Sequence, residues 1–420
     1  MLARLKSLKI MQSLYQLQGN TFVSVIFEPL WGIPFVLYNF YLSLYMIELG
    51  VTPEQLGYLI AIGSIAGIFF SAISGMVTDA LGRKKTTFIF EFLSWPLAIF
   101  IFMISNNFWL FALATVVNSL VRIVFVSWNL MVVEDADCKQ QITAYTLLNI
   151  INISVGIITP LAGLMVSGLG IVKAERIIMG FAVVSMTAMI FLRNHFYTET
   201  KVGQEVLEHR RTQKTALDKG ERVLELAKFQ FKPALKTFLV ASVLFNAYIP
   251  IGGFSSLYFA PYLTEALKLN KSIIALMGGI FAATMFLVLV IGMPLIHRIN
   301  RINGVITGIL IQMLAMGLLV LIPTRSLLAV IITVIVFAAG FGITKPLFDS
   351  MLAEYTEGRS RARLYALNNS LISVVSAILG FGSGYLFHIQ PALIYVLSLL
   401  LLLMCLGSLF RLKFLSTQES

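Results

Sequence analysis

The stretch from Glu54 to Val77, EQLGYLIAIGSIAGIFFSAISGMV, decides the fold class, because it is long and almost uncharged. A helix needs about 20 mostly apolar residues to cross the hydrocarbon core of a bilayer. Eight residues, TDALGRKK at positions 78–85, separate this stretch from a second apolar run at positions 86–104. Two such runs joined by a short basic turn are typical of consecutive transmembrane helices.

The composition of the whole chain agrees with this interpretation. Of its 420 residues, 58% are hydrophobic and 12% are charged, and the charged fraction is about half of that in soluble domains. The formal net charge is +11, but the basic residues are scattered through short segments between apolar runs and lack the motifs of a nucleic-acid-binding domain. We therefore predict an all-α membrane protein whose surroundings are the lipid bilayer, with no nucleic-acid partner.

The apolar runs predict twelve transmembrane helices. They lie near residues 20–46, 54–77, 86–104, 109–131, 142–169, 174–193, 237–262, 272–296, 303–323, 326–349, 364–386 and 391–411. The one long polar segment, Arg193 to Lys236, contains ten Lys/Arg and six Asp/Glu residues. It divides the chain into an N-terminal six-helix half (1–192), a linker (193–236) and a C-terminal six-helix half (237–420).

The distribution of basic residues predicts the orientation. Placing the N-terminus in the cytoplasm leaves 24 Lys/Arg residues in inner segments and five in outer loops. Cytoplasmic loops of membrane proteins are enriched in Lys and Arg. We expect both termini and the linker to be cytoplasmic, and a multi-pass protein of the cell (plasma) membrane.

An internal repeat relates the two halves. Residues recur in order at offsets of 217 (Tyr41, Tyr45, Glu48 with Tyr258, Tyr262, Glu265) and 220 (Met131, Glu134, Tyr145, Leu147, Asn149 with Met351, Glu354, Tyr365, Leu367, Asn369). Parallel six-helix repeats are a transporter architecture whose substrate site lies near the midplane, between the halves.

The turn between the second and third spans contains a motif. It reads Gly75-Met-Val-Thr-Asp79-Ala-Leu-Gly82-Arg83-Lys84-Lys85, and it resembles the cytoplasmic loop signature of the major facilitator superfamily. The resemblance implies that Gly75, Asp79, Gly82, Arg83 and Lys84 form a cytoplasmic gate motif. In such a motif Asp79 would latch the two halves together when the transporter faces outward.

A second resemblance lies in the fifth span. The run Gly156-Ile-Ile-Thr159-Pro160-Leu-Ala-Gly163-Leu164 resembles the signature of proton-coupled exporters of the same superfamily, with Thr159 and Leu164 at positions where that signature has glycine. The alternative is that these small residues and the proline serve helix packing, as they commonly do in membrane helices.

Charged residues inside apolar spans are the strongest functional candidates, because each costs on the order of 2.5–3.5 kcal/mol at mid-bilayer. Glu28 in span one and Arg122 in span four are expected at similar depths, where they can pair or compete for substrate. This combination resembles the multidrug/proton antiporters of the superfamily, with Glu28 as the protonation site; the alternative is a fixed ion pair between two helices. Glu91, Lys345 and Asp349 lie closer to span ends, which favours interface or gate roles.

Polar and aromatic residues predict the lining of a cavity. We expect the lining to include Trp31, Tyr38, Asn118, Asn149, Asn152 and Asn246. An aromatic wall with few polar groups suits an amphipathic or aromatic ligand.

These features predict a secondary active transporter that works by alternating access. Proton-coupled export of an amphipathic or drug-like small molecule, with protons as the coupling ion, is the favoured function, giving an antiporter active in efflux. The alternatives are proton-coupled uptake of a sugar, peptide or organic acid, and a transporter-like sensor or lipid scramblase without concentrative transport. The sequence contains no nucleophile–base set, phosphate loop or metal-ligand spacing, so we expect no enzyme activity, no metal and no cofactor, and a monomer.

Overall fold

The computed structural model describes residue 14 and residues 16–212, 233–292, 300–355 and 361–418. Within these ranges, twelve helices are long and apolar enough to cross a membrane. Each of the twelve overlaps one predicted span, which confirms the fold class. Residues 213–232 of the predicted linker lie outside the described residues.

Several spans of the N-terminal half consist of more than one helix. Its helices are α2 (Gly19–Ile26), α3 (Glu28–Glu48), α4 (Pro53–Leu81), α5 (Arg83–Phe92), the π-helical turn η1 (Leu93–Leu97), α6 (Ala98–Ile104), α7 (Phe108–Asn118), α8 (Val121–Val133), α9 (Cys138–Gly156), α10 (Pro160–Leu169) and α11 (Ile171–Phe196). Helix α12 (Lys201–Thr212) follows this half and is polar.

The C-terminal half has fewer interruptions. Its helices are α14 (Pro233–Gly252), α15 (Phe259–Pro261), the π-helical turns η3 (Tyr262–Ala266) and η4 (Val288–Gly292), α16 (Ala275–Leu287), α18 (Arg301–Leu321), α19 (Leu327–Tyr355), α20 (Arg361–Ile389) and α21 (Leu393–Gln418). Span seven was predicted to run to residue 262, but α14 ends at Gly252.

The breaks and starts of these helices have local causes. Helix α4 begins at a capping box, in which the Thr52 hydroxyl accepts from the Gln55 N–H and the Gln55 side chain accepts from the Thr52 N–H. Pro96 lies in the π-helical turn of span three, and Pro160 follows the break between α9 and α10. Proline lacks the N–H that would continue the helical hydrogen bonds.

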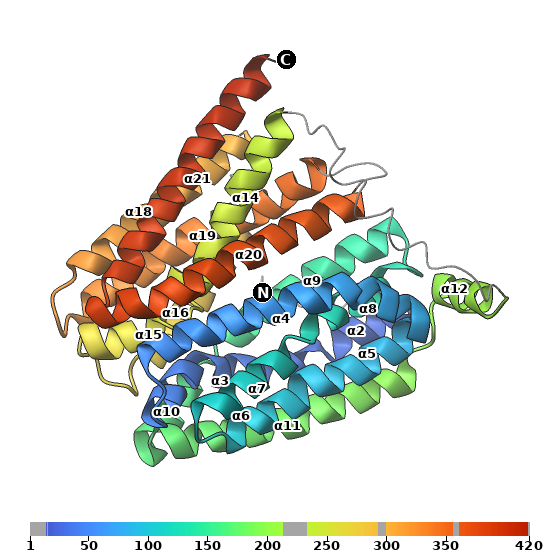
Figure 1. The fold of residues 1–420 in the computed structure, drawn as a ribbon, viewed down its shortest axis with the longest axis horizontal. Helices are drawn as coiled ribbons and strands as arrows, with labels where there is room; N and C mark the ends of the chain where they lie inside the picture. Colours follow the sequence, from blue (N-terminus) through green and yellow to red (C-terminus); the bar gives the residue numbers. More distant parts are fainter. Residues whose placement is uncertain (1–13, 15, 213–232, 293–299, 356–360, 419–420) are drawn as a thin grey trace, which may run out of the picture.

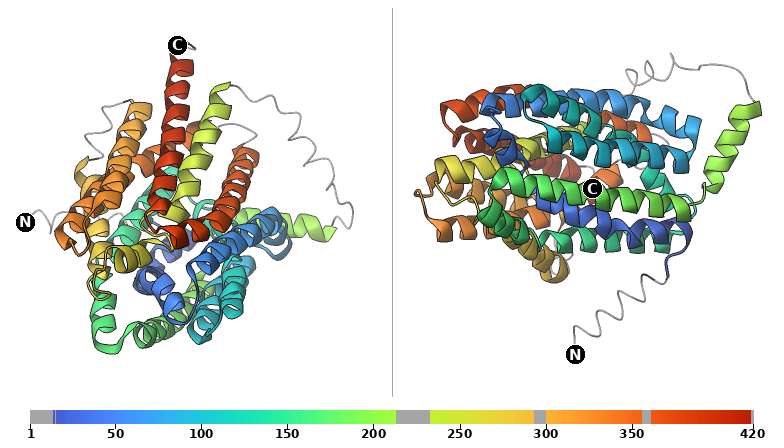
Figure 2. Two further views of the ribbon diagram at one scale, coloured as in Figure 1. Left: turned by 60° about the vertical axis from the view of Figure 1, so that its left-hand side comes forward. Right: turned by 90° about the horizontal axis from the view of Figure 1, so that it is seen from below.

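The two halves form a V (Figures 1 and 2). We call the end of the bundle that carries the start of α2, the end of α11 and α12 the linker side, and the opposite end the far side. The halves are close together on the far side, at the left of Figure 1, and diverge toward the linker side. The sequence predicts that the linker side is cytoplasmic.

Glycines allow the close approach on the far side. A Cβ atom added to Gly57 of α4 would lie 2.4 Å from the carbonyl oxygen of Gly380 in α20, and one added to Gly384 would lie 2.4 Å from the Cα of Glu54. Two polar contacts join the same region: an ion pair of Lys271 with Glu48, and a contact of His388 Nδ1 with Glu54 Oε1 at 2.8 Å. The far side is therefore closed by backbone-to-backbone packing as well as by polar contacts.

Tyrosine hydrogen bonds agree with the internal repeat. The Tyr45 hydroxyl lies 2.9 Å from the carbonyl oxygen of Met103 and 3.3 Å from that of Phe102, and the Tyr262 hydroxyl donates to the carbonyl of Leu319 at 2.9 Å. Phe102 and Leu319 each follow their tyrosine by 57 residues. The other repeated pair crosses between the halves: the Tyr41 hydroxyl donates to Lys271 O at 2.7 Å, and the Tyr258 hydroxyl to Pro53 O at 3.3 Å. The repeat thus contributes two equivalent contacts to the far-side closure.

Large apolar side chains cover the outside of the bundle. Trp109 and Leu321 are each 77% exposed, and Phe69 is 61% exposed. Such a surface suits lipid contact and is unusual for a soluble protein.

Candidate functional site

A buried cluster of one arginine and two glutamates lies in the N-terminal half. The Arg193 guanidinium donates from Nη2 to Glu28 Oε2 at 2.7 Å and from Nη1 to Glu91 Oε1 at 3.1 Å. The three residues are at most 5% exposed. Two carboxylates therefore share one cation, and the formal charge is −1 when both are ionised.

Three spans position these side chains. Glu28 is in the first turn of α3, directly after the break at Phe27 that separates α2 from α3. Glu91 lies two residues before the π-helical turn of span three, and Arg193 is in the last turn of α11. Further contacts fix the guanidinium: Nη2 also donates to Ser24 O at 2.7 Å, and the guanidinium carbon lies 5.8 Å from the ring centre of Trp128.

The cluster forms part of the wall of a cavity of about 240 Å³, which we call the tryptophan cavity. Its lining is Glu28, Trp31, Glu91, Trp95, Val121, Val124, Phe125, Trp128, Asn152 and Arg193. Three of the chain's four tryptophans line it, and the Trp31 and Trp95 rings meet edge to face at 5.2 Å. The cavity thus combines an aromatic box with an excess of negative charge.

A second cavity, of about 210 Å³, lies between the halves, and we call it the interface cavity. Its lining includes Phe35 and Phe40 of α3 and, from the other half, Phe254, Phe259 and Phe281. Asn152 of α9 lines both cavities. A ligand near Asn152 can therefore touch the charged cluster's cavity and both halves of the molecule.

Arg122 is not the partner of Glu28, so the expected pairing of these two residues is wrong, while their competition for a substrate stays a prediction. Arg122 is exposed and lies against Gly67 of α4, where an added Cβ would be 3.3 Å from Nε. Among the described residues it has no ion pair. The break between α7 and α8 lies just before it, whereas the predicted depth assumed a straight helix. Glu91, expected in an interface or gate role, belongs to the Glu28 cluster instead.

The structure places two of the expected lining residues at the cavities, Trp31 and Asn152. Tyr38 is 4% exposed and packs edge to face on Phe35. Asn118 donates to Ser94 O and Asn246 to Ser242 O, both at 2.9 Å, so their amides are used within the helical scaffold. Asn149 is exposed and lies in α9, one helical turn before Asn152. Tyr38, Asn118, Asn149 and Asn246 do not line these two cavities.

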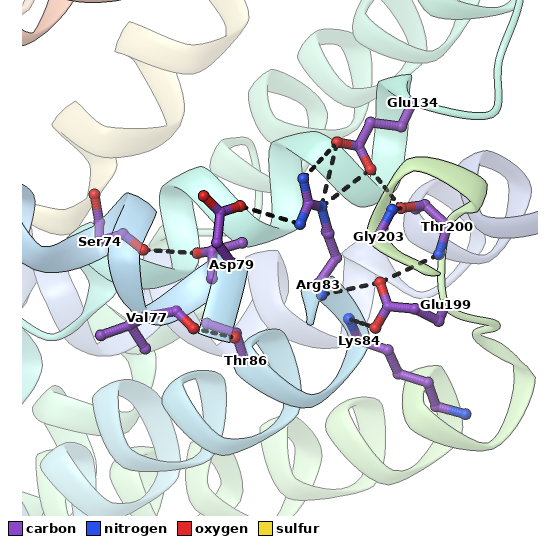
Figure 3. A network of polar contacts seen from close by, with 11 residues as sticks. Ser74, Val77, Asp79, Arg83, Lys84, Thr86, Glu134, Glu199, Thr200 and Gly203 are labelled. Carbon is purple, nitrogen blue, oxygen red and sulfur yellow. Dashed lines mark hydrogen bonds and ion pairs between the residues drawn. The ribbon is translucent and has the colours of Figure 1, made fainter. Parts of the chain in front are cut away.

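The gate motif forms a polar network on the linker side (Figure 3). Arg83 donates to Asp79 Oδ1 at 3.2 Å and to both oxygens of Glu134 at 3.2 Å. A Cβ atom added to Gly75 would meet no atom within 4 Å, and Lys84 contributes its backbone N–H. The partners drawn in Figure 3 belong to the N-terminal half and the start of the linker. The expected latch between Asp79 and the other half therefore stays a prediction for another state.

Glu199 attaches the start of the linker to this network. Its carboxylate accepts from the backbone N–H groups of Arg83 at 2.9 Å and Lys84 at 3.1 Å, at the start of α5 (Figure 3). Gly82 precedes α5 with a φ of +85°, and a Cβ there would lie 2.5 Å from Glu199 Oε2. Glycine at position 82 thus permits both the turn and the docking of Glu199.

The other sequence candidates have structural contacts. Lys345 and Asp349 pair with each other at 2.6 Å in α19. In the span-five motif, Thr159 packs against Gly278 and Pro160 against Gly279, both in α16 of the other half. These contacts agree with the packing alternative for that motif.

The sequence predictions missed several polar residues. Arg193 was counted in the linker, but α11 continues to Phe196; because residues 193–195 are Arg, Asn and His, hydropathy did not indicate the longer helix. Glu134 and Glu199 gave no motif signal. Glu175 falls within predicted span six (174–193) but was not among the charged candidates, yet it is 0% exposed.

Comparisons with known proteins agree with the fold. The family model described as Major Facilitator Superfamily matches residues 30–259 and 240–419. A comparison with curated proteins returns no match.

Solved structures with this fold cover most of the chain. A bacterial homologue of the iron transporter ferroportin, in an inward-facing state, has a TM-score of 0.67 at 13% identity, covering 94% of this chain and 98% of that chain. The nucleoside transporter NupG has a TM-score of 0.69 at 13% identity, covering 94% and 99%. The xylose transporter XylE from E. coli, in an inward open conformation, has a TM-score of 0.68 at 13% identity, covering 94% of each.

Proposed function

This chain belongs to the Major Facilitator Superfamily, and we propose that it exports an amphipathic, drug-like small molecule in exchange for protons. The superfamily's transporters move solutes by alternating access, in which two halves rock around a central site. Here the halves meet on the far side and diverge on the linker side (Figure 1). This arrangement supports a state in which the central cavities open toward the predicted cytoplasm.

The observation that carries the proposal is the shared arginine of Glu28 and Glu91. Arg193 compensates one carboxylate, so the second favours binding a further positive charge. That charge is either a proton or the cationic group of a substrate. Competition between the two for one site gives exchange, because binding of substrate expels the proton.

The shape of the two cavities supports an amphipathic substrate. The tryptophan cavity offers aromatic faces and negative charge, which attract organic cations. The interface cavity, reached past Asn152, offers phenylalanine side chains from both halves. A substrate with a cationic group and an apolar aromatic part matches these two neighbouring cavities.

Transport in everted membrane vesicles tests the proposal. With the vesicle interior acidified, a panel of amphipathic fluorescent dyes that includes ethidium is offered, and we expect at least one dye to accumulate. Glu28→Gln and Glu91→Gln should abolish that uphill flux. Glu265→Gln is the matched control, because Glu265 is an exposed carboxylate in η3, away from the cluster.

Three results would contradict the proposal. If no dye in the panel shows gradient-driven flux, the result argues against drug export. Flux out of the everted vesicles would indicate uptake into cells. Undiminished flux in both cluster variants would remove the proton role from Glu28 and Glu91.

A further inference from the structure

Glu175 is a buried carboxylate outside the cluster described above. It lies near the start of α11, at the far side, and is 0% exposed. Neither of its carboxylate oxygens has a hydrogen-bond partner among the described residues. The cluster at Arg193 is at the other end of the same helix.

No basic side chain among the described residues pairs with Glu175. Helix α3 brings the phenols of Tyr38, Tyr41 and Tyr45 near enough for electrostatic interaction. The other elements packed near this end of α11, namely α6, α10 and η1, contain no acidic, basic, tyrosine or cysteine residue. Helices α2 and α5 pack against the opposite end of α11, where Arg193 meets Glu28 and Glu91.

The neighbouring basic residues on α11 are directed elsewhere. Arg176 donates from Nη2 to Asn106 Oδ1 at 2.6 Å and from Nε to the Tyr45 hydroxyl at 3.4 Å. Lys173 is exposed. An ionised carboxylate without a partner in a dry interior is strongly unfavourable, and such a group takes up a proton instead.

One neighbour of Glu175 connects it to the far-side closure. The Tyr41 hydroxyl donates to the carbonyl of Lys271 in the other half, and Lys271 itself pairs with Glu48 of α3. When the halves separate on the far side, Tyr41 loses this acceptor and water reaches the region. Both changes favour the ionised form of Glu175.

We propose that Glu175 is a second proton-binding site, which holds a proton while the far side is closed and releases it when the far side opens. This goes beyond the proposed function, because it requires neither a particular substrate nor protonation of Glu28 or Glu91. It also places a proton site at each end of α11. The closed state then binds one more proton than the open state.

Infrared spectroscopy of the purified protein tests the protonation directly. The test uses the Glu28→Gln/Glu91→Gln double variant, in which the cluster has no carboxyl group to protonate. At neutral pH we expect this variant to show the carbonyl stretch of a neutral carboxylic acid, which a further Glu175→Gln removes and a further Glu265→Gln retains. Absence of the band from the double variant, or its persistence after Glu175→Gln is added, would overturn the proposal.

Cysteine labelling tests the link to the far side. In protein with Cys138 and Cys405 replaced, Thr159→Cys places a thiol that is buried against Gly278 in the closed state. An impermeant thiol reagent is added at the far side, and the labelling rate is measured with Glu175 present and in Glu175→Gln. The first rate is divided by the second at each pH, because the reactivity of the thiol itself also changes with pH. The ratio should rise with pH by at most tenfold per unit, because the open state has lost one proton.

Two further variants make this test decisive. Glu265→Gln should follow the pH dependence of the parent. Glu175→Met, which removes the titrating group without a polar replacement, should behave like Glu175→Gln and covers the case in which the glutamine variant folds poorly. A ratio that does not change with pH would overturn the proposal, whether or not the transport experiments succeed.

Discussion

At the residue scale, the stability of the buried cluster depends on Arg193, because one guanidinium compensates both Glu28 and Glu91. Arg193→Gln leaves both carboxylates without a cation, and breaking a buried pair in this way costs about 3–5 kcal/mol. We expect a clear fall in the melting temperature of the detergent-solubilised protein. The triple variant, with Glu28→Gln and Glu91→Gln added, should recover most of the loss.

Arg122→Gln is the control for this experiment, because Arg122 has no ion pair among the described residues, and its melting temperature should stay near that of the parent. An equal destabilisation by Arg122→Gln would show that Arg122 also compensates a buried charge.

The triple variant Glu28→Gln/Glu91→Gln/Arg193→Gln should be stable and still fail to transport. Recovery of uphill flux in it would mean that the cluster only braces the helices.

The sequence identified Glu28 because a carboxylate inside an apolar run is costly and therefore conspicuous. It did not identify the partner. The depth assigned to Arg122 assumed an unbroken span four. Arg193, at the last position of predicted span six, was counted with the polar linker and not with the charges inside spans. Contacts between side chains depend on helix breaks and rotation, which hydropathy does not report.

At the scale of elements, the docking of α12 depends on Glu199, whose carboxylate accepts two N–H groups at the start of α5. Glu199→Gln replaces the negatively charged acceptor of these hydrogen bonds by a neutral amide. Hydrogen bonds to charged groups contribute about 1.5–3 kcal/mol to stability. We expect the amides of α12 to exchange with deuterium roughly ten- to a hundredfold faster. Hydrogen exchange followed by mass spectrometry measures this, with Glu205→Gln, an exposed residue of the same helix, as the control.

Unchanged exchange in Glu199→Gln would mean that other contacts hold α12 in place.

The polar network of the gate motif could be predicted only in part from the sequence. The motif identified Asp79, Gly82 and Arg83, but Glu134 and Glu199 approach from elements 50 or more residues away. The helices were predictable because length and hydropathy alone define a span, whereas π-helical turns and breaks depend on packing.

At the scale of the whole molecule, the internal repeat indicated two related halves but not the state in which they are found. The far-side closure arises from backbone contacts at Gly57, Gly380 and Gly384, residues that in sequence resemble any other small residues of a membrane helix. A transporter sequence encodes at least two arrangements of its halves. The partners of Asp79 in the other arrangement therefore stay a prediction from the motif.

Gly384→Val tests whether this backbone packing holds the far side shut. Its Cβ would lie 2.4 Å from the Glu54 Cα and 2.7 Å from Pro53 O, so α4 and α20 must move apart. Overpacking of this kind costs about 1–3 kcal/mol, which shifts an equilibrium between two states by roughly 5- to 150-fold. We expect labelling of Thr159→Cys from the far side to rise by a factor in this range.

Gly382→Val supplies the matched control, because Gly382 lies two residues away on α20 and an added Cβ there meets no atom within 4 Å. Its labelling rate should equal that of the parent. If both valines raise labelling equally, the effect comes from altered helix propensity in α20. If Gly384→Val lowers the melting temperature but leaves labelling unchanged, the clash is absorbed within the closed state. The contacts of Lys271 with Glu48 and of His388 with Glu54, together with the tyrosine contacts, then hold the far side without the glycines.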